Sequence, residues 1–301
     1  MRKYVKLIGM ITAPGLAETL LFGLANGAIY ILLATGLNLI FGVMKLVNFA
    51  HGQLLMVGAF IAYEATVRVG LSPYLSIFVA IGGVALIGII LEKFAFRKVR
   101  GTEKLNEIFV SLGLIYIFQN AATLLWEKNF NIRIPSPLEG DNLYLGSISL
   151  PYDRIIAILV VVLILFGLII LTQKTKIGLA MRATSQKGDA AMLMGIDIGR
   201  VYVFTFAVGA ALAGAAGALY GILLPFNPTI GALPTIKAFA IIILGGLGSI
   251  PGAVVGGLLY GVAENTASYL SNGIWQDAIG FALLIAVLAI RPTGLFGKKG
   301  E

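Results

Sequence analysis

The sequence predicts an all-α protein, a polytopic bundle of transmembrane helices. The mean hydropathy is +0.95, and 58% of the 301 residues are hydrophobic while only 12% are charged. Apolar runs recur along most of the chain, and several reach the roughly 20 residues that a helix needs to cross a ~30 Å hydrocarbon core. The basic residues gather in the short connections between these runs, as is typical of membrane proteins. We therefore expect residues 1–301 to form a single transmembrane domain.

The apolar segments define the expected elements in order. They lie at about residues 16–47, 50–70, 74–92, 105–126, 154–172, 200–224, 232–248, 251–270 and 276–290. The first segment is too long for one ordinary span and too short for two. Gly36 and Gly42 can interrupt a helix there, which predicts a broken or re-entrant element, since irregular backbone is tolerated where protein or water covers it. The expected number of membrane segments is therefore nine or ten.

The charged residues predict the orientation. Three basic clusters separate the apolar segments: Lys93, Arg97, Lys98, Arg100 and Lys104; Lys174, Lys176, Arg182, Lys187 and Arg200; Arg291, Lys298 and Lys299. The positive-inside tendency places all three in the cytoplasm. Residues 127–153, with acidic side chains and with Pro135 and Pro137, are expected to form an outside loop. Nine spans would leave the N-terminal basic residues outside, whereas a tenth, partial crossing would bring them inside. The sequence therefore leaves open on which side of the membrane the N-terminus lies.

The chain begins with a basic stretch, as a signal peptide does. The apolar run that follows, Leu7 to Ile11, is shorter than the roughly 7–15 residues that such a signal needs. We expect an uncleaved, short interfacial segment.

Several classes of chemistry are excluded by composition. The chain has no cysteine and one histidine, His51, so we expect no metal site and no cofactor. It has neither a G-x-x-x-x-G-K-[ST] phosphate loop nor a G-x-S-x-G nucleophile motif, which argues against an enzyme. The net charge of +8 comes from short loops rather than from one basic patch, which argues against nucleic-acid binding.

Polar side chains within apolar segments are candidates for a substrate path, because in hydrocarbon they usually face the interior of the bundle. The candidates are Asn26, Tyr30, Asn38, Asn48, His51 and Gln53. For each of them, a structural hydrogen bond between helices is the alternative interpretation. Asn26 and Tyr30 are four residues apart and share a helix face. Glu64 and Glu264 lie near predicted outer ends, where we expect solvated or snorkelling carboxylates.

Glycine is abundant, with 38 residues. The repeats Gly217-x-x-x-Gly221, Gly252-x-x-x-Gly256 and Gly257-x-x-x-Gly261 place small residues on one helix face, which lets helices approach closely. We interpret them as packing sites within a tight bundle.

A polar connection at residues 173–199 interrupts the apolar pattern and contains the stretch KGDAAMLMGID. Asp189 can cap a helix start, and Gly195 suits the left-handed residue that ends a helix. The short helix between them would be marginal alone, but its alanines would let it fit closely into the groove of a partner. A plain connecting turn on the membrane surface is the alternative.

The same stretch, Asp189-Ala190-Ala191-x-x-x-Gly195, resembles the Glu-Ala-Ala-x-x-x-Gly loop of ABC importer permeases, with Asp in place of Glu. Three further stretches are similar to the permease subunit of branched-chain amino acid ABC importers: GLNLIFGVMKLVNFAHG (36–52), KAFAIIILGGLGSIPGAVVGGLLYGVAE (237–264) and RPTGLFG (291–297). The run Asn48 to Gly52 is the most specific of them. The resemblance extends over residues 16–297, nearly the whole chain.

The resemblance implies the ABC importer permease fold, alternating access and a place in the inner membrane. It implies three kinds of protein partner besides the lipid bilayer, and no nucleic acid: a second related permease, two ABC ATPase subunits and an extracytoplasmic substrate-binding protein. Residues 173–199 would be the cytoplasmic coupling loop, and the residues expected to contact the ATPase are Asp189, Ala190, Ala191, Leu193, Met194 and Gly195. Gly195→Pro or Ala191→Arg should then abolish uptake without loss of membrane insertion.

Three other functions remain open at this point, of which a membrane-embedded structural subunit of a larger enzyme has the least support. Relatives in this group also carry urea or short amides, so the substrate is less firmly implied than transport. An ion-coupled secondary carrier is the rival from another class. The apparent lack of a carboxylate in the middle of a membrane segment, together with the coupling-type loop, argues against that rival.

Overall fold

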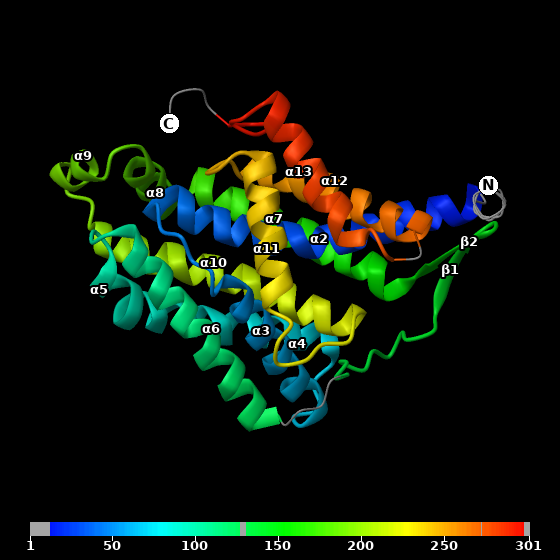
Figure 1. Cartoon of the computed structure of the whole chain (residues 1–301). Helices are drawn as coiled ribbons and strands as arrows, with labels where there is room; N and C mark the ends of the chain where they lie inside the picture. Colours follow the sequence, from blue (N-terminus) through cyan, green and yellow to red (C-terminus); the bar gives the residue numbers. More distant parts are fainter. Residues whose placement is uncertain (1–12, 127–130, 272, 298–301) are drawn as a thin grey trace.

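The computed structural model describes residues 13–126, 131–271 and 273–297, and it forms a bundle of helices with one short hairpin (Figure 1). The first half contains α2 (Ala13–Met44), α3 (His51–Val67), α4 (Pro73–Leu91), the π-helix η1 (Glu92–Phe96), α5 (Arg97–Val99) and α6 (Lys104–Trp126). The hairpin is β1 (Asn142–Leu145) with β2 (Ile148–Pro151). The second half contains α7 (Tyr152–Lys174), α8 (Lys176–Gln186), α9 (Gly188–Leu193), α10 (Ile198–Leu223), α11 (Ala232–Gly245), α12 (Ile250–Ser271) and α13 (Gln276–Ile290).

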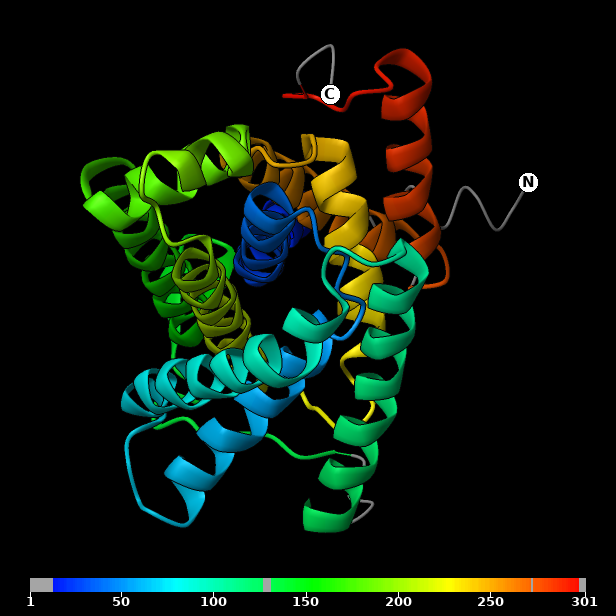
Figure 2. The same ribbon diagram turned by 90° about the vertical axis from the view of Figure 1, so that its left-hand side faces the viewer.

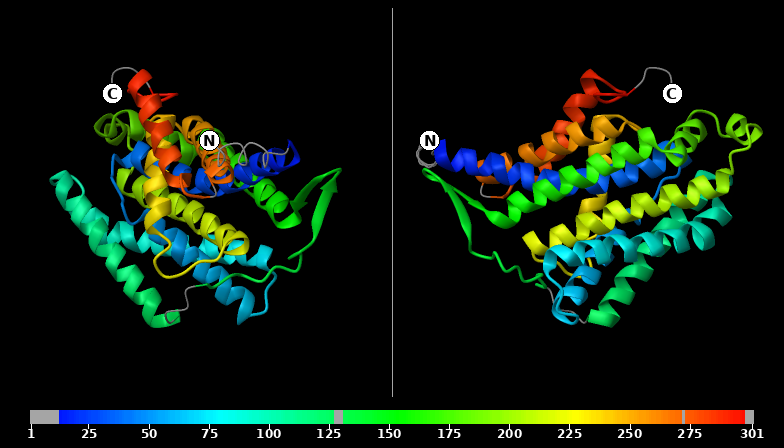
Figure 3. Two further views of the ribbon diagram at one scale, coloured as in Figure 1. Left: turned by 45° about the vertical axis from the view of Figure 1, so that its right-hand side comes forward. Right: turned by 180° about the vertical axis from the view of Figure 1, so that it is seen from behind.

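The long helices run between two ends of the molecule (Figures 1 and 3). We call the end with β1 and β2 the hairpin end and the end with α5, α8 and α9 the basic end. Helix α2 begins at the hairpin end, where the Ser149 amide donates to Glu18 Oε1 at 2.6 Å. It finishes at the basic end, where Lys104 Nζ donates to the Lys45 carbonyl at 2.8 Å. The interfacial segment expected at Leu7 to Ile11 lies outside the described residues.

Helix α2 is one continuous helix of 32 residues, so the predicted interruption within it is wrong. It lies at the centre of the bundle, enclosed by α7, α10, α11 and α12 (Figure 2). Gly36 and Gly42 serve close packing rather than a break. A Cβ atom on Gly36 would lie 2.6 Å from the Gly209 carbonyl, and one on Gly42 would lie 3.3 Å from the Gly248 Cα.

The expected nine or ten membrane segments are not confirmed. Among the described residues, five helices are long and apolar enough to cross a membrane, and α11 with α12 makes a sixth if this bent pair is one span. The apolar runs at 50–70, 232–248 and 276–290 form helices of 17, 14 and 15 residues. The coarser prediction, a helical multi-pass membrane protein, is confirmed.

Two of these short helices, α3 and α11, meet at their N-termini. The Gly52 amide donates to Thr235 Oγ1 at 3.0 Å. A side chain on Gly52 would overlap the Gly231 carbonyl, so only glycine permits this approach. The first residues of α3 are completely buried.

The break in the helical pattern occurs between α11 and α12, where the chain direction bends by 118°. The Asn38 side chain, which extends from α2, holds the connecting residues. Its Nδ2 donates to the Ser249 carbonyl at 2.8 Å, and its Oδ1 accepts from the Gly248 amide at 2.7 Å. Gly246 and Gly248 adopt φ of +105° and +80°, which suits glycine.

The glycine repeats are sites of close packing, as predicted. Gly257 and Gly261 of α12 cross Gly23 and Gly27 of α2, where a Cβ atom on Gly23 would lie 2.9 Å from the Val262 Cα. Gly217 lies against the Leu55 carbonyl of α3 in the same way. The backbones approach so closely that larger side chains would have to displace a neighbouring helix.

The predicted outside loop contains the hairpin, which the sequence did not indicate. The strands pair antiparallel with Leu143 opposite Leu150, and Gly146 turns the chain at φ +64°.

Candidate functional site

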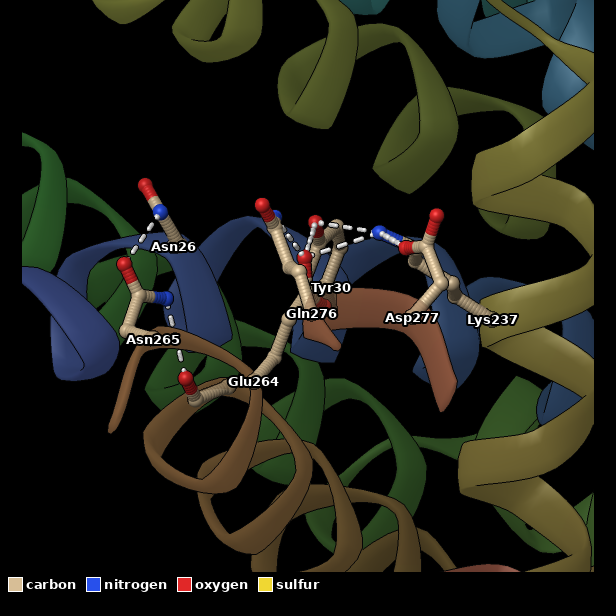
Figure 4. Close-up of polar contacts among 8 residues, drawn as sticks. Asn26, Tyr30, Lys237, Glu264, Asn265, Gln276 and Asp277 are labelled. Carbon is tan, nitrogen blue, oxygen red and sulfur yellow. Dashed lines mark hydrogen bonds and ion pairs between the residues drawn. The ribbon is translucent and has the colours of Figure 1, made fainter. Parts of the chain in front are cut away.

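A charged cluster lies within the bundle, where side chains of α2, α11, α12 and α13 meet (Figure 4). We define the charged cluster as Tyr30, Lys237, Glu264, Gln276 and Asp277. Lys237 Nζ lies 2.8 Å from Glu264 Oε1 and 2.9 Å from Asp277 Oδ1. The Tyr30 hydroxyl and the Gln276 amide also donate to Glu264 Oε1, at 3.2 and 2.6 Å. One ammonium group therefore bridges two carboxylates.

Four different helices supply the charged cluster, namely α2, α11, α12 and α13. Glu264 is 0% exposed and Lys237 6%, whereas the Asp277 side chain is 50% exposed. The cluster thus extends from the interior of the bundle to its surface. The expectation of a solvated Glu264 is wrong, because α11 and α13 cover this part of α12. The buried Glu264, which lies within α12, also weakens the argument from a missing carboxylate in the middle of a membrane segment.

A polar extension continues from the charged cluster toward the hairpin end. Asn26 Nδ2 donates to Asn265 Oδ1 at 3.1 Å, and Arg154 contacts Asn26 Oδ1 at 3.4 Å. The Arg154 guanidinium also lies 4.0 Å from the centre of the Phe22 ring. As their four-residue spacing predicts, Asn26 and Tyr30 face the same neighbouring helix, α12.

The chemistry of the charged cluster is unusual for a membrane interior. Burying charges is unfavourable unless they are paired and hydrogen-bonded, and ionisable groups within transmembrane segments are commonly functional. Glu264 Oε2 and the Tyr260 hydroxyl are buried and make no hydrogen bond within the described part of the chain. The cluster therefore combines both signs of charge with buried hydrogen-bonding atoms that the described residues leave unpaired.

A second polar group surrounds the N-terminus of α3. We call Asn48, His51 and Gln53 the α3 start group; all three are fully buried. The Gln53 amide and Asn48 Nδ2 have no hydrogen-bond partner among the described residues. Neither ring nitrogen of His51 has a hydrogen bond of good geometry there, although the Leu33 backbone lies against the ring. Each unpaired buried group is destabilising by roughly 1–3 kcal/mol, so this arrangement needs a reason beyond packing.

The six predicted path residues therefore occupy three places. Asn26 and Tyr30 belong to the charged cluster and its extension, and Asn48, His51 and Gln53 form the α3 start group. Asn38 holds the turn between α11 and α12. Sequence reasoning missed Lys237, Gln276 and Asp277; a signal for Lys237 was present, since it is a lone lysine in the apolar segment 232–248.

The predicted coupling loop forms two helices at the basic end, α8 and α9 (Figure 1). Lys187 occupies the N-cap of α9 and makes no side-chain capping bond, so the predicted capping role of Asp189 is wrong. Asp189 lies in the first turn instead. Gly195 follows α9 at φ +83°, which confirms the predicted left-handed residue. The aspartate that does cap a helix is Asp197, whose Oδ1 accepts from the Arg200 amide at the start of α10.

Large apolar side chains are exposed at the C-terminal end of α9. Ala191 is 5% exposed and packs inward, whereas Leu193 and Met194 are 89% and 83% exposed. Ala190 lies on the exposed side of the same helix. Large apolar side chains that project from a polar segment are typical of a protein-binding surface.

Within the described residues, no group of three or more His, Asp and Glu side chains is placed to hold a metal ion. No solved structure matches the chain.

Comparison with known proteins identifies the family. Residues 19–288 match the family described as "Branched-chain amino acid transport system / permease component". The permease protein BraD of the high-affinity branched-chain amino acid transport system of Pseudomonas aeruginosa is 34% identical over 297 residues, covering 93% of this chain and 95% of BraD. The corresponding LivH of Escherichia coli (strain K12) is 33% identical, covering 92% of this chain and 94% of LivH.

A more distant relative has another substrate in its name. The fructose import permease FrcC of Rhizobium meliloti is 27% identical over 231 residues, covering 72% of this chain and 61% of FrcC. The matched region of the family model includes the charged cluster, the α3 start group and the coupling loop. The chain belongs to the family of permease components of branched-chain amino acid transport systems.

Proposed function

We propose that this chain is the membrane permease subunit of an ATP-driven importer of branched-chain and other hydrophobic amino acids. The proposal rests on the similarity to BraD and LivH, which extends over more than nine tenths of the chain. The chain has no phosphate-binding loop, so separate ATPase subunits would hydrolyse ATP. It would reside in the inner membrane, with its basic end in the cytoplasm.

The coupling loop would transmit the movement of the ATPases. The exposed apolar side chains at the end of α9, those of Leu193 and of Met194 directly after it, would enter a groove on an ATPase subunit, and Asp189 would face the same partner. The buried Ala191 would keep α9 close to the rest of the permease. Closure of the ATPase dimer would then push on residues 173–199 and rock the helices of an alternating-access path.

The charged cluster supports an amino acid as solute. A free amino acid carries an ammonium and a carboxylate, and the cluster offers Glu264 and Asp277 to the first and Lys237 to the second. Asn26 and Tyr30 would line the path on the α2 side. A zwitterion that enters could exchange charge partners with the cluster without leaving an isolated buried charge.

The α3 start group would form the next part of the path. Its unpaired polar atoms lie where the N-termini of α3 and α11 meet, and half-helix N-termini in transporters favour the anionic end of a substrate. Hydrogen bonds to a passing solute would satisfy Asn48, His51 and Gln53. Asn38 would contribute indirectly, through the bend between α11 and α12.

The assembly would contain a second related permease, two ABC ATPase subunits and an extracytoplasmic substrate-binding protein. The binding protein would dock at the hairpin end and deliver the solute near the exposed Asp277. The lipid bilayer would cover the outward sides of α6 and α7, which expose large apolar side chains.

Two alternatives need a direct test. FrcC, a permease of similar sequence, is named for a different solute, fructose. Urea or a short amide would also fit a polar path. The buried Glu264 removes one argument against an ion-coupled carrier, but the relatives are named as permease proteins of transport systems rather than as lone carriers.

The decisive experiment is uptake by proteoliposomes. The chain, co-expressed with the other subunits encoded beside its gene, should accumulate labelled leucine only with ATP and binding protein. Labelled fructose and urea serve as matched solutes, and the chain reconstituted alone serves as the control. Uptake of leucine by the chain alone, driven by an ion gradient, would refute the importer proposal, and ATP-driven uptake of fructose or urea instead of leucine would refute the substrate class.

A further inference from the structure

A pocket of about 440 Å³ opens at the basic end, between the end of α4 and the start of α10. Figure 1 shows α5, which continues α4, beside the first turn of α10 at this end. The pocket is separate from the charged cluster, the α3 start group and the exposed side of α9.

The walls of the pocket change in character with depth. Ile89, Lys93 and Arg97 are four residues apart and share one side of the α4 to α5 segment. Arg200 lies one turn before the next wall residues of α10, which are Val203, Phe204 and Ala207. Helices α4 and α10 run in opposite directions, so the three cations lie at the mouth and the apolar side chains lie deeper in the membrane.

The mouth has an excess of positive charge. Three cations and one carboxylate, that of Asp197, line the pocket. Arg200 Nε pairs with Asp197 at 2.9 Å, and Arg97 pairs with the buried Glu92 at 3.3 Å. Lys93 is exposed at the mouth and makes no ion pair or hydrogen bond with any described residue. A ligand with negative charge would give it a partner.

We propose that this pocket binds an anionic phospholipid, with the headgroup phosphate at Lys93, Arg97 and Arg200 and an acyl chain along Ile89, Val203 and Phe204. Basic pockets between helices on the cytoplasmic side are suited to anionic headgroups, and each nearby cation contributes about 1 kcal/mol to such binding. Arginine adds paired hydrogen bonds to phosphate oxygens. The apolar wall in the deeper part of the pocket favours a lipid over free phosphate, because free phosphate would leave that wall in contact with water.

The test measures lipid retention by native mass spectrometry of the purified full chain in detergent. Phosphatidylglycerol is titrated in. Phosphatidylcholine of the same chain length, which is zwitterionic and has no net charge, is the control lipid. Lys93→Gln and Arg200→Gln should each reduce phosphatidylglycerol binding about fivefold, equivalent to ~1 kcal/mol, without changing phosphatidylcholine binding. Lys98→Gln, an exposed cation of the same segment that does not line the pocket, is the control and should bind as the unchanged chain does.

A separate arm tests the source of the phosphate. Inorganic phosphate in millimolar excess should displace little phosphatidylglycerol; complete displacement would show an anion site and overturn the lipid assignment. Equal phosphatidylglycerol binding by Lys93→Gln, Arg200→Gln and Lys98→Gln would overturn the pocket itself. Neither result depends on which solute the protein transports, so failure here is distinct from failure of the uptake experiment.

Discussion

At the scale of single residues, Lys237 decides the electrostatics of the bundle interior. It is the cation that lies between Glu264, which is fully buried, and Asp277, which is half exposed. Removal of one partner from a buried ion pair leaves an uncompensated charge, whereas removal of both charges is much less destabilising. The two carboxylates therefore differ: Asp277 can be hydrated without Lys237, and Glu264 cannot.

This asymmetry predicts the outcome of a double-mutant cycle. Lys237→Met should destabilise the protein by about 3–5 kcal/mol, because the buried Glu264 loses its countercharge. The double variant Lys237→Met with Glu264→Gln should recover most of that loss, since Gln keeps hydrogen bonds to Tyr30 and Gln276. Thermal unfolding in detergent measures both, with Lys98→Met as the exposed control. A double variant no more stable than Lys237→Met alone would contradict the ion-pair argument.

At the scale of elements, small residues set how the helices cross. Helices α2 and α12 each contribute two glycines four residues apart to one contact, Gly23 with Gly27 and Gly257 with Gly261. This close approach positions Tyr30 of α2 and Glu264 of α12 within hydrogen-bonding distance. The packing of the backbone and the charged cluster therefore depend on the same contact.

The crossing can be tested by one pair of substitutions. Gly261→Leu should prevent folding or lower stability by at least the ~1–3 kcal/mol typical of overpacking, because its Cβ would meet the backbone of Gly27. Gly82→Leu in α4 is the matched control, since no atom lies within 4 Å of its Cβ position. The yield of monodisperse protein after purification is the measurement. Equal yields from the two variants would contradict the close crossing.

Helix α9 gives a second prediction at this scale. Leu193 is 89% exposed, so Leu193→Asp should leave the permease folded while it weakens binding of the ATPase and abolishes ATP-driven uptake. Leu145→Asp in the hairpin, also exposed, is the matched control at the opposite end. Co-purification of the ATPase is the measurement, and its full retention by Leu193→Asp would count against docking through α9.

The structure also shows why Leu193→Asp is a sharper test than Ala191→Arg or Gly195→Pro. Ala191 is buried and Gly195 adopts φ +83°, so changes at these two positions would distort α9 itself. Loss of uptake in those variants would combine a local structural defect with a binding defect.

At the scale of the whole molecule, the two ends differ in charge and in construction. The basic end contains α5, α8 and α9, and the hairpin end contains β1 and β2 (Figure 3). The distribution of lysine and arginine predicts that the basic end lies in the cytoplasm. Helix α2 begins at the hairpin end, which favours an outside start for this helix.

The orientation can be measured directly because the chain has no cysteine. Single cysteines introduced as Ser147→Cys in the hairpin and Gln186→Cys at the end of α8 are both at exposed positions. A membrane-impermeant maleimide should label Ser147→Cys in intact cells and Gln186→Cys only after the membrane is opened. The reverse pattern would mean that the orientation is inverted.

The sequence by itself determined the features that depend on local composition. Apolar runs predicted helices at the right places, the charge distribution distinguished the two ends, and the glycine repeats predicted close packing. The motif residues 189–195 predicted a short helix ended by Gly195. Each of these follows from length, hydropathy or backbone preference within a few turns of one helix.

Only the tertiary structure decided which segments meet. It showed that α2 is continuous and that the bend lies between α11 and α12, because glycines in either place look alike until their neighbours are known. It also brought Lys237, Glu264 and Asp277 together from three helices. Whether a carboxylate is solvated or buried depends on which helix covers it, and this contact is made by residues far apart in the chain.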